Sequence, residues 1–125
     1  MTHAAYETVQ ATTADPARVM LLLFDGAARF LRQSQEGLRR GEPGAFAYPL
    51  SRAHAIIAEL AGSLDYEKGG EVALNLGRLY EFMLRHLTEG LVGRSGSHVS
   101  RVLGLLQELR AGFEQAIRAA GHEPA

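Results

Sequence analysis

Apolar residues recur every three or four positions in four successive segments of the chain, and this spacing predicts four amphipathic helices. The first predicted helix has a clear start, because Asp15 suits an N-cap and Pro16 suits the first helical position. It is expected to end near Gly41, before the turn signal Glu42-Pro43-Gly44. Its row, which only a serine interrupts, is Met20, Phe24, Ala27, Leu31, Ser34 and Leu38.

The second predicted helix keeps the same spacing without interruption. Pro49 lies early in this segment, so either the regular helix begins near Tyr48 or Pro49 bends a first turn that already exists. Lys68-Gly69-Gly70 predicts the turn that closes the segment. The apolar row of this helix is Phe46, Leu50, Ala53, Ile57, Leu60 and Leu64.

The third predicted helix runs from about Glu71 to Gly90, and the fourth begins near Ser97 after a loop at Gly93–Ser97. The row of the third helix is Ala73, Leu76, Tyr80, Met83 and Leu87. The row of the fourth helix is Val102, Leu106, Leu109, Phe113, Ala116 and Ala120.

No segment shows the alternation and β-branched content of a strand. Four helices joined by short loops predict an all-α fold, an antiparallel up-down-up-down four-helix bundle with an N-terminal arm. We expect the arm at residues 1–14, the bundle at 15–120 and a short tail at 121–125.

Composition narrows the function classes. A net charge of −1 in 125 residues offers no broad electrostatic field for nucleic acid or anionic lipid. The longest apolar run, Val19–Phe24, is far shorter than the ~20 residues of a membrane span. Met1–Asp15 lacks the basic-then-apolar order of a signal peptide, and the absence of cysteine suits a reducing compartment. We therefore expect a soluble, cytoplasmic protein without a membrane span or a nucleic-acid partner.

The four segments carry more apolar residues than one bundle-facing row requires. Two interpretations stay open: small bundles often have broad apolar faces, or the surplus forms a groove for an amphipathic helix of a partner. The residues outside the main rows are Leu21, Leu22, Leu23, Phe30, Ile56, Val72, Leu79, Phe82, Leu84, Val99, Leu103, Leu105 and Ile117.

The sequence predicts no catalytic residue, metal site or cofactor, and hence no enzyme. The five histidines form no ligand pair at i, i+3 or i, i+4, and no helix carries the Glu-x-x-His repeat of a metal-binding bundle. The alternative function is a histidine-phosphotransfer bundle, with His54 or His86 as the phosphoryl acceptor. Neither histidine is followed by the lysine that usually steadies the phosphoryl group.

Four blocks of residues follow one another along the chain: Tyr6, Val9, Gln10 and Thr12; Asp15-Pro16 with Met20 through Leu31; Ala53, Ile56-Ile57, Glu59-Leu60 and Ser63-Leu64-Asp65; and Gly69-Gly70-Glu71, Ala73, Asn75-Leu76, Leu79-Tyr80 and Phe82-Met83. In this order they resemble the flagellin-specific secretion chaperones of the FliS family. The departures are a Gly- and Ser-rich loop at 90–96 and Phe113 where the family often has a tryptophan.

This resemblance implies a cytoplasmic export chaperone. Such a chaperone binds the disordered C-terminal segment of flagellin, prevents premature polymerisation and passes flagellin to the flagellar export apparatus. The bound segment folds into helices, which requires much apolar burial. Self-association through the empty groove stays open.

We expect the flagellin-binding groove on the second and third predicted helices, and we expect the arm to cover part of it in the free protein. Asn75 is included because its amide would suit the backbone of the partner. The candidate binding residues are Tyr6, Val9, Ile56, Ile57, Leu60, Leu64, Asn75, Leu76 and Tyr80.

Overall fold

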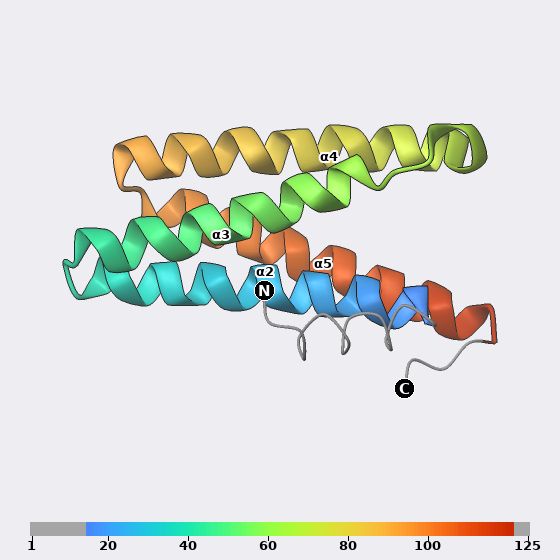
Figure 1. Cartoon of the computed structure of the whole chain (residues 1–125), viewed down its shortest axis with the longest axis horizontal. Helices are drawn as coiled ribbons and strands as arrows, with labels where there is room; N and C mark the ends of the chain where they lie inside the picture. The colour runs from blue at the N-terminus through green and yellow to red at the C-terminus, as the bar shows by residue number, and fades with distance from the viewer. Residues whose placement is uncertain (1–14, 122–125) are drawn as a thin grey trace, which may run out of the picture.

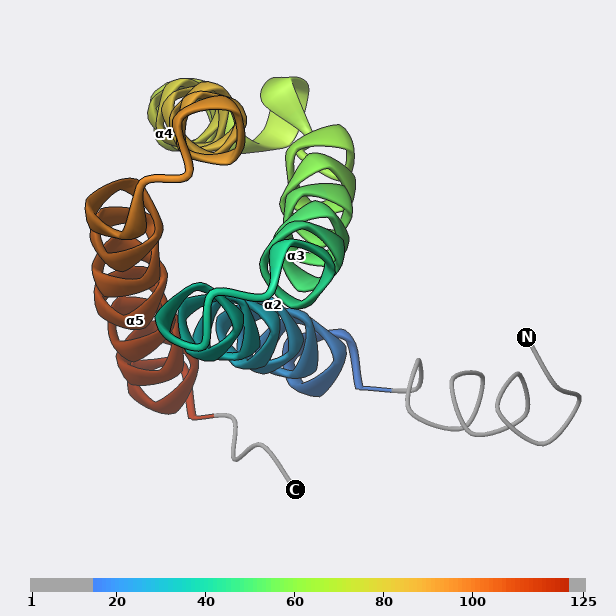
Figure 2. The same ribbon diagram turned by 90° about the vertical axis from the view of Figure 1, so that its left-hand side faces the viewer.

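The computed structural model describes residues 15–121, in which four helices follow one another (Figure 1). Helix α2 packs against α3 and α5, and α4 packs against the same two neighbours, so the four helices surround one core (Figure 2). The predicted all-α, up-down-up-down bundle is confirmed. The helices are α2 (Pro16–Arg39), α3 (Pro43–Gly62), α4 (Tyr66–Gly93) and α5 (Gly96–Ala119).

The predicted arm and residues 122–125 lie outside the described residues. No strand occurs between residues 15 and 121. In the same part of the chain, no helix has the length and apolar character needed to cross a membrane.

Side-chain caps explain where three helices begin. The carboxylate of Asp15 accepts a hydrogen bond from Arg18 N at 3.4 Å, as the sequence predicted for this boundary. Asp65 accepts from Lys68 N at 3.0 Å and starts α4, and Ser95 accepts from the backbone N–H of the third residue of α5. These caps satisfy N–H groups that have no partner within the helix.

Helix α3 continues through Pro49, so the alternative start near Tyr48 is wrong. Pro49 has no N–H and cannot donate to the carbonyl of Ala45. That carbonyl lies directly against Gly37 of α2, where an added Cβ would overlap with it. Glycine at this position therefore lets the first turn of α3 touch the backbone of α2.

The connection between α3 and α4 differs from the prediction. Helix α3 ends at Gly62, and Asp65 then caps a short helical turn where the sequence predicted Lys68-Gly69 to be non-helical. The predicted break is nevertheless present at Gly70, whose φ of 50° and ψ of −126° interrupt α4. The N-cap formed by Asp65 explains the extra turn, because it stabilises a helix start at Tyr66. The glycines at 69 and 70 had indicated a non-helical turn there.

The connection between α4 and α5 is shorter than predicted. Helix α4 runs to Gly93 instead of ending near Gly90, and α5 already begins at Gly96. Arg94 has a left-handed backbone with a φ of 49°, which ends α4 and leaves Ser95 in the N-cap position of α5.

The core is concentrated toward one end of the bundle, which we call the closed end: it holds the α2–α3 and α4–α5 connections. The opposite end, the open end, holds the start of α2, the α3–α4 connection and the end of α5 (Figure 1). Val99, which the sequence placed outside the main row, is fully buried, whereas Ala116 and Ala120 of that row are exposed. The buried core cluster is Phe24, Ala27, Leu31, Phe46, Leu50, Ala53, Ile57, Leu60, Tyr80, Met83, Leu87, Val99, Val102 and Leu106.

Candidate partner-binding groove

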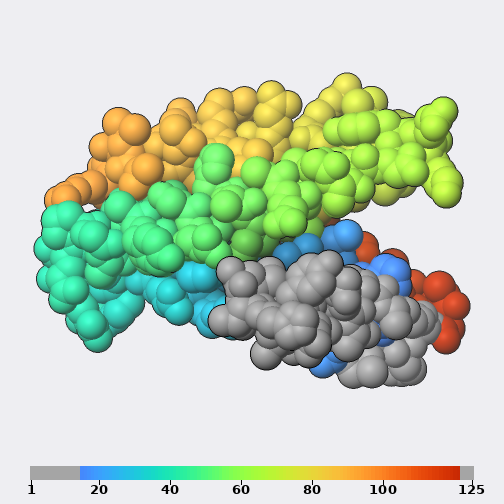
Figure 3. All heavy atoms as spheres, in the orientation of Figure 1, coloured from blue at the N-terminus to red at the C-terminus, as the bar shows by residue number. Residues whose placement is uncertain are grey.

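The molecule is hollowed at its open end, between the first part of α4 on one side and the first part of α2 with the last part of α5 on the other (Figure 3). A cavity of about 320 Å³ lies here, and all four helices contribute to its wall. Its lining is mostly apolar, with Ser63, Asp65 and Lys68 as the polar exceptions at the α3–α4 connection. The apolar part of the wall consists of Met20, Phe24, Leu60, Leu64, Val72, Ala73, Leu76, Tyr80, Leu109 and Phe113, with Gly69 beside them.

A second hollow of about 360 Å³ continues from the first across the end of α3. The two hollows share Met20 and Ser63, so together they form one surface that we call the open-end groove. The second hollow is lined by Pro16, Val19, Met20, Leu23, Glu59 and Ser63.

The backbone at the start of α4 shapes one wall of this groove. The break at Gly70 separates the first turn of α4 from the rest of the helix. Tyr66 lies beside Gly77, where an added Cβ would be 2.6 Å from the tyrosine hydroxyl and 3.5 Å from Leu64 Cδ1. The missing side chain at Gly77 thus makes room for the residues that form the rim.

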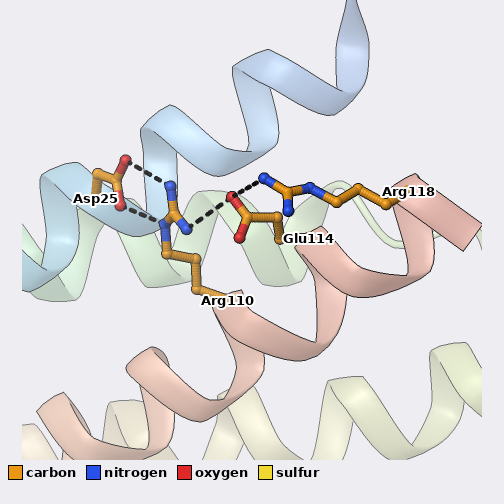
Figure 4. Close-up of polar contacts among 4 residues, drawn as sticks. All are labelled: Asp25, Arg110, Glu114 and Arg118. Carbon is orange, nitrogen blue, oxygen red and sulfur yellow. Dashed lines mark hydrogen bonds and ion pairs between the residues drawn. The ribbon is translucent and has the colours of Figure 1, made fainter. Parts of the chain in front are cut away.

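The opposite wall is held in place by contacts between α2 and α5. The rings of Phe24 and Phe113 meet at a centroid distance of 5.9 Å. Next to them, the guanidinium of Arg110 donates two hydrogen bonds to Asp25, at 2.6 and 3.3 Å, and one to Glu114 at 3.3 Å (Figure 4). The bond to Asp25 raises the pKa of Arg110. Arg110 therefore remains a charged link between the two helices.

Four of the predicted binding residues line the open-end groove: Leu60, Leu64, Leu76 and Tyr80. Leu64 and Leu76 are half-buried, whereas Leu60 and Tyr80 are only 1% and 3% exposed. Burial also raises the pKa of the Tyr80 hydroxyl, which therefore stays protonated. Leu64 and Leu76 are thus the residues of this group with apolar surface available to a partner.

Of the other predicted residues, the three that the structure describes do not line the groove. Ile57 is fully buried in the core, and half-buried Ile56 packs over Gly26, with its Cδ1 3.6 Å from where a Cβ would be. Asn75 is exposed on α4. Tyr6 and Val9 lie outside the described residues. The binding role of each of these residues stays a prediction.

Sequence reasoning missed the contribution of α2 and α5 to the groove. Met20, Leu109 and Phe113 belong to rows that the periodicity assigns to the core, yet each is only half-buried. Val72 was recognised as surplus and is 68% exposed on the groove wall. The surplus of apolar residues was therefore the sequence feature that indicated groove residues. Periodicity identifies the row that faces other helices, but it does not show where along the row the neighbouring helix is too distant to cover it.

The histidines are arranged differently from what a phosphoryl acceptor requires. The ring of His86 stacks on Phe82 at 4.9 Å and on His98 at 4.1 Å, and only 18% of its side chain is exposed. His54 is half-buried in a small hollow with Leu50 and Thr88. The fold also brings His86, Glu89 and His98 together, although the spacing of histidines along the sequence predicted no metal-ligand set.

Comparison with known proteins agrees with the resemblance found in the sequence. The family model described as "Flagellar protein FliS" matches residues 1–120. The chain is 34% identical over 105 residues to "Flagellar secretion chaperone FliSB" of Pseudomonas aeruginosa, covering 84% of this chain and 83% of that protein. It is 36% identical over 104 residues to "Flagellar secretion chaperone FliS" of Salmonella typhimurium, covering 82% and 77%. The chain therefore belongs to the FliS family of flagellar secretion chaperones.

Proposed function

We propose that this chain is a cytoplasmic export chaperone that binds the disordered C-terminal segment of flagellin. In this role it prevents premature polymerisation and aids delivery of flagellin to the flagellar export apparatus. The observation that supports this proposal is the apolar open-end groove in a chain of the FliS family. The family is a chaperone family, and an apolar groove of this kind suits binding better than catalysis.

The groove has the properties that helix-in-groove recognition needs. Apolar side chains of all four helices converge on it, and several of them remain half-buried or exposed in the free protein. A disordered segment that folds on binding must recover its ordering entropy through apolar burial. An amphipathic helix laid along the groove would cover Leu64, Leu76 and Val72 and provide that burial.

The polar rim would orient such a helix. Asp65 and Lys68 border the first hollow, and Glu59 borders the second. Their charges offer partners for polar residues beside the apolar face of the flagellin helix. In this scheme Ile56 and Ile57 do not contact flagellin and instead pack together the helices that form the groove. Asn75 offers its amide to the partner from the exposed side of α4.

No observation favours the histidine-phosphotransfer alternative. A phosphoryl acceptor must present its ring to a partner enzyme, whereas the ring of His86 lies against two other rings. Self-association through the empty groove remains compatible with the same apolar surface, and it would compete with flagellin for Val72 and its neighbours.

The test is a titration of the purified chain with a peptide of the flagellin C-terminus, followed by circular dichroism and calorimetry. We expect saturable binding with a gain of helix beyond the sum of the two free components, because the peptide folds on the groove. Light scattering of the chain with and without peptide separates binding from dissociation of a self-associated form. Absence of binding, together with acid-labile phosphorylation of His54 or His86, would overturn the proposal in favour of phosphotransfer.

A further inference from the structure

Two histidines and a glutamate meet near the closed end, where α4 and α5 approach their connection. His86 and Glu89 are three residues apart on α4, and His98 lies in the first turn of α5. The ligand atoms of the three side chains all lie within 4.8 Å of one another. His86 Nδ1 is 3.7 Å from a carboxylate oxygen of Glu89, and the two imidazole rings stack at 4.1 Å with an angle of 27°.

The backbone brings these side chains together. Gly90 is buried against His98, and an added Cβ at Gly90 would lie only 2.8 Å from His98 Cβ. The N-cap Ser95 fixes the other side of the ring, because its Oγ lies 2.6 Å from His98 Nδ1. The contact with Gly90 therefore places His98 close to α4, and the hydrogen bond to Ser95 fixes its ring at the start of α5, both independently of Glu89.

We propose that His86, Glu89 and His98 bind a divalent transition-metal ion of the Zn²⁺ class, with water in the remaining coordination position. Two imidazoles and one carboxylate are a common protein ligand set for Zn²⁺ when one position stays open. Bonds of about 2.0–2.1 Å place tetrahedral ligand atoms about 3.3 Å apart, so the three groups need to draw together by at most about 1.5 Å. The Glu89 side chain is 59% exposed and free to move, whereas the two stacked imidazole rings must turn so that their in-plane lone pairs converge on the ion.

The hydrogen bonds around His98 leave one of its ring nitrogens for a metal. When His98 Nδ1 donates to Ser95 Oγ, Nε2 carries the lone pair that binds a metal. Ser95 Oγ then donates its own proton to Ser97 Oγ at 3.0 Å, so the hydroxyl is satisfied in this arrangement.

This Ser95 contact is the kind of outer hydrogen bond that orients metal-ligating histidines. Arg101 carries a positive charge that would oppose the binding of a cation. Its guanidinium lies over the Phe82 ring at 5.6 Å and adds positive potential near His86. The carboxylate of Glu89 offsets this charge. A bound ion would join α4 to α5 and stabilise the closed end without touching the open-end groove.

The proposal is tested with the full, untagged chain after removal of metal by a chelator. Calorimetric titration with Zn²⁺ alone should show one saturable site. The thermal unfolding midpoint should rise by roughly 5–10 °C when free Zn²⁺ exceeds Kd about 100-fold. Replacing Zn²⁺ by Co²⁺ should give the visible absorption bands of a low-symmetry site with nitrogen ligands.

Two variants test the ligands, and a third serves as the control. His98→Ala and the exposed Glu89→Gln should each weaken Zn²⁺ binding by at least about tenfold, since losing an outer-shell partner alone costs that much. His54→Ala is the matched control, because His54 is also half-buried but lies outside the cluster, and it should bind Zn²⁺ like the parent chain. Circular dichroism without metal verifies that each variant keeps its helix content.

Two results would overturn the proposal. One is equal Zn²⁺ affinity of the parent chain and of a His86→Ala, His98→Ala double variant, which would assign the ion to another place. The other is a loss of affinity in His54→Ala as large as in His98→Ala. Glu89→Gln protects the test against unfolding artefacts, because Glu89 is on the surface and does not belong to the core cluster.

Discussion

The closed end and the open end of the bundle are built from the same four helices, yet their apolar residues are buried to different extents. At the closed end, the hydroxyl of buried Ser34 donates to the carbonyl of Phe46 at 2.9 Å, and Gly37 lies against the backbone of α3. Val99 and Val102 are fully buried there. At the open end, Val72 is 68% exposed, and Leu109 and Phe113, which belong to the same row as Val102, are half-buried.

The difference shows how a small bundle combines stability with an apolar binding surface. Close backbone contacts at the closed end fix the directions of the helices, so the helices need not pack tightly along their whole length. Where α4 lies away from α2 and α5, the same apolar periodicity produces a groove instead of a core (Figure 3). The closed end should therefore control folding, and the open end should control binding.

The strongest test of this division is Gly37→Ala at the closed end. The new methyl group would overlap with the carbonyl of Ala45, and backbone on both sides leaves little room for relaxation. Overpacking of this kind destabilises by about 3 kcal/mol. Denaturant unfolding of the parent chain and the variant measures this loss of stability.

The matched control is Gly112→Ala in α5, where an added Cβ meets nothing within 4 Å. Alanine is the better helix former, so this variant should gain about 0.5–1 kcal/mol. If Gly37→Ala proved as stable as Gly112→Ala, the backbone contact at the closed end would not determine the fold.

The next largest effect is expected for flagellin binding by Val72→Asp. Val72 lines the open-end groove and is largely exposed, so the charge should leave folding intact and weaken peptide binding at least tenfold, or about 1.4 kcal/mol. Calorimetric titration with the flagellin C-terminal peptide gives the change in Kd.

Val92→Asp provides the control on the same helix. Val92 is 82% exposed at the other end of α4 and lines neither hollow of the groove. Its substitution should leave Kd within about twofold, as expected for surface changes away from a binding site. Equal losses in Val72→Asp and Val92→Asp would remove the distinction between the two ends as binding surfaces.

A smaller effect is expected from deletion of Met1–Gln10, which removes Tyr6 and Val9. If this arm covers part of the open-end groove in the free chain, only a fraction of molecules is ready to bind, and the deletion removes that restriction. We expect affinity or association rate to rise by about two- to fivefold in a stopped-flow or calorimetric experiment. Unchanged binding would exclude a covering role for the arm.

Much of the fold was predictable because local signals and periodicity agreed. The row from Met20 to Leu38 faces the core as predicted, and Asp15 caps α2. Ser34, the one polar residue of that row, is buried because it reaches a carbonyl across the helix interface. The sequence allowed α3 either to begin near Tyr48 or to have a first turn before Pro49, and it did not decide between them, since the first turn depends on Gly37 of another helix admitting the Ala45 carbonyl.

The groove was predictable only in part, because exposure depends on the distance between helices. Leu64 and Leu76 were identified from the surplus of apolar residues, and they line the groove. Ile57 has the same spacing and chemistry but is fully buried nearer the middle of α3. The cluster of His86 and His98 was likewise hidden, because its two histidines come from different helices and meet through Gly90.

The smallest expected effect concerns the ion pair that joins α2 to α5 at the open end. Asp25 and Arg110 are 49% and 33% exposed, so Asp25→Asn should cost only about 0.5 kcal/mol, and less at high salt because exposed charges are screened. Glu36→Gln is the control, since its partners Arg39 and Arg40 lie three and four residues later in the chain and link no second helix.

A double-mutant cycle of Asp25→Asn with Arg110→Gln isolates the interaction energy of the pair from the remaining bond between Arg110 and Glu114. If the pair positions the groove wall, the same cycle read by peptide Kd should show coupling as well as the cycle read by unfolding. Coupling in stability without coupling in binding would mean that the contact of Phe24 with Phe113 is sufficient to position that wall. The open end would then owe its shape to apolar packing and not to this ion pair.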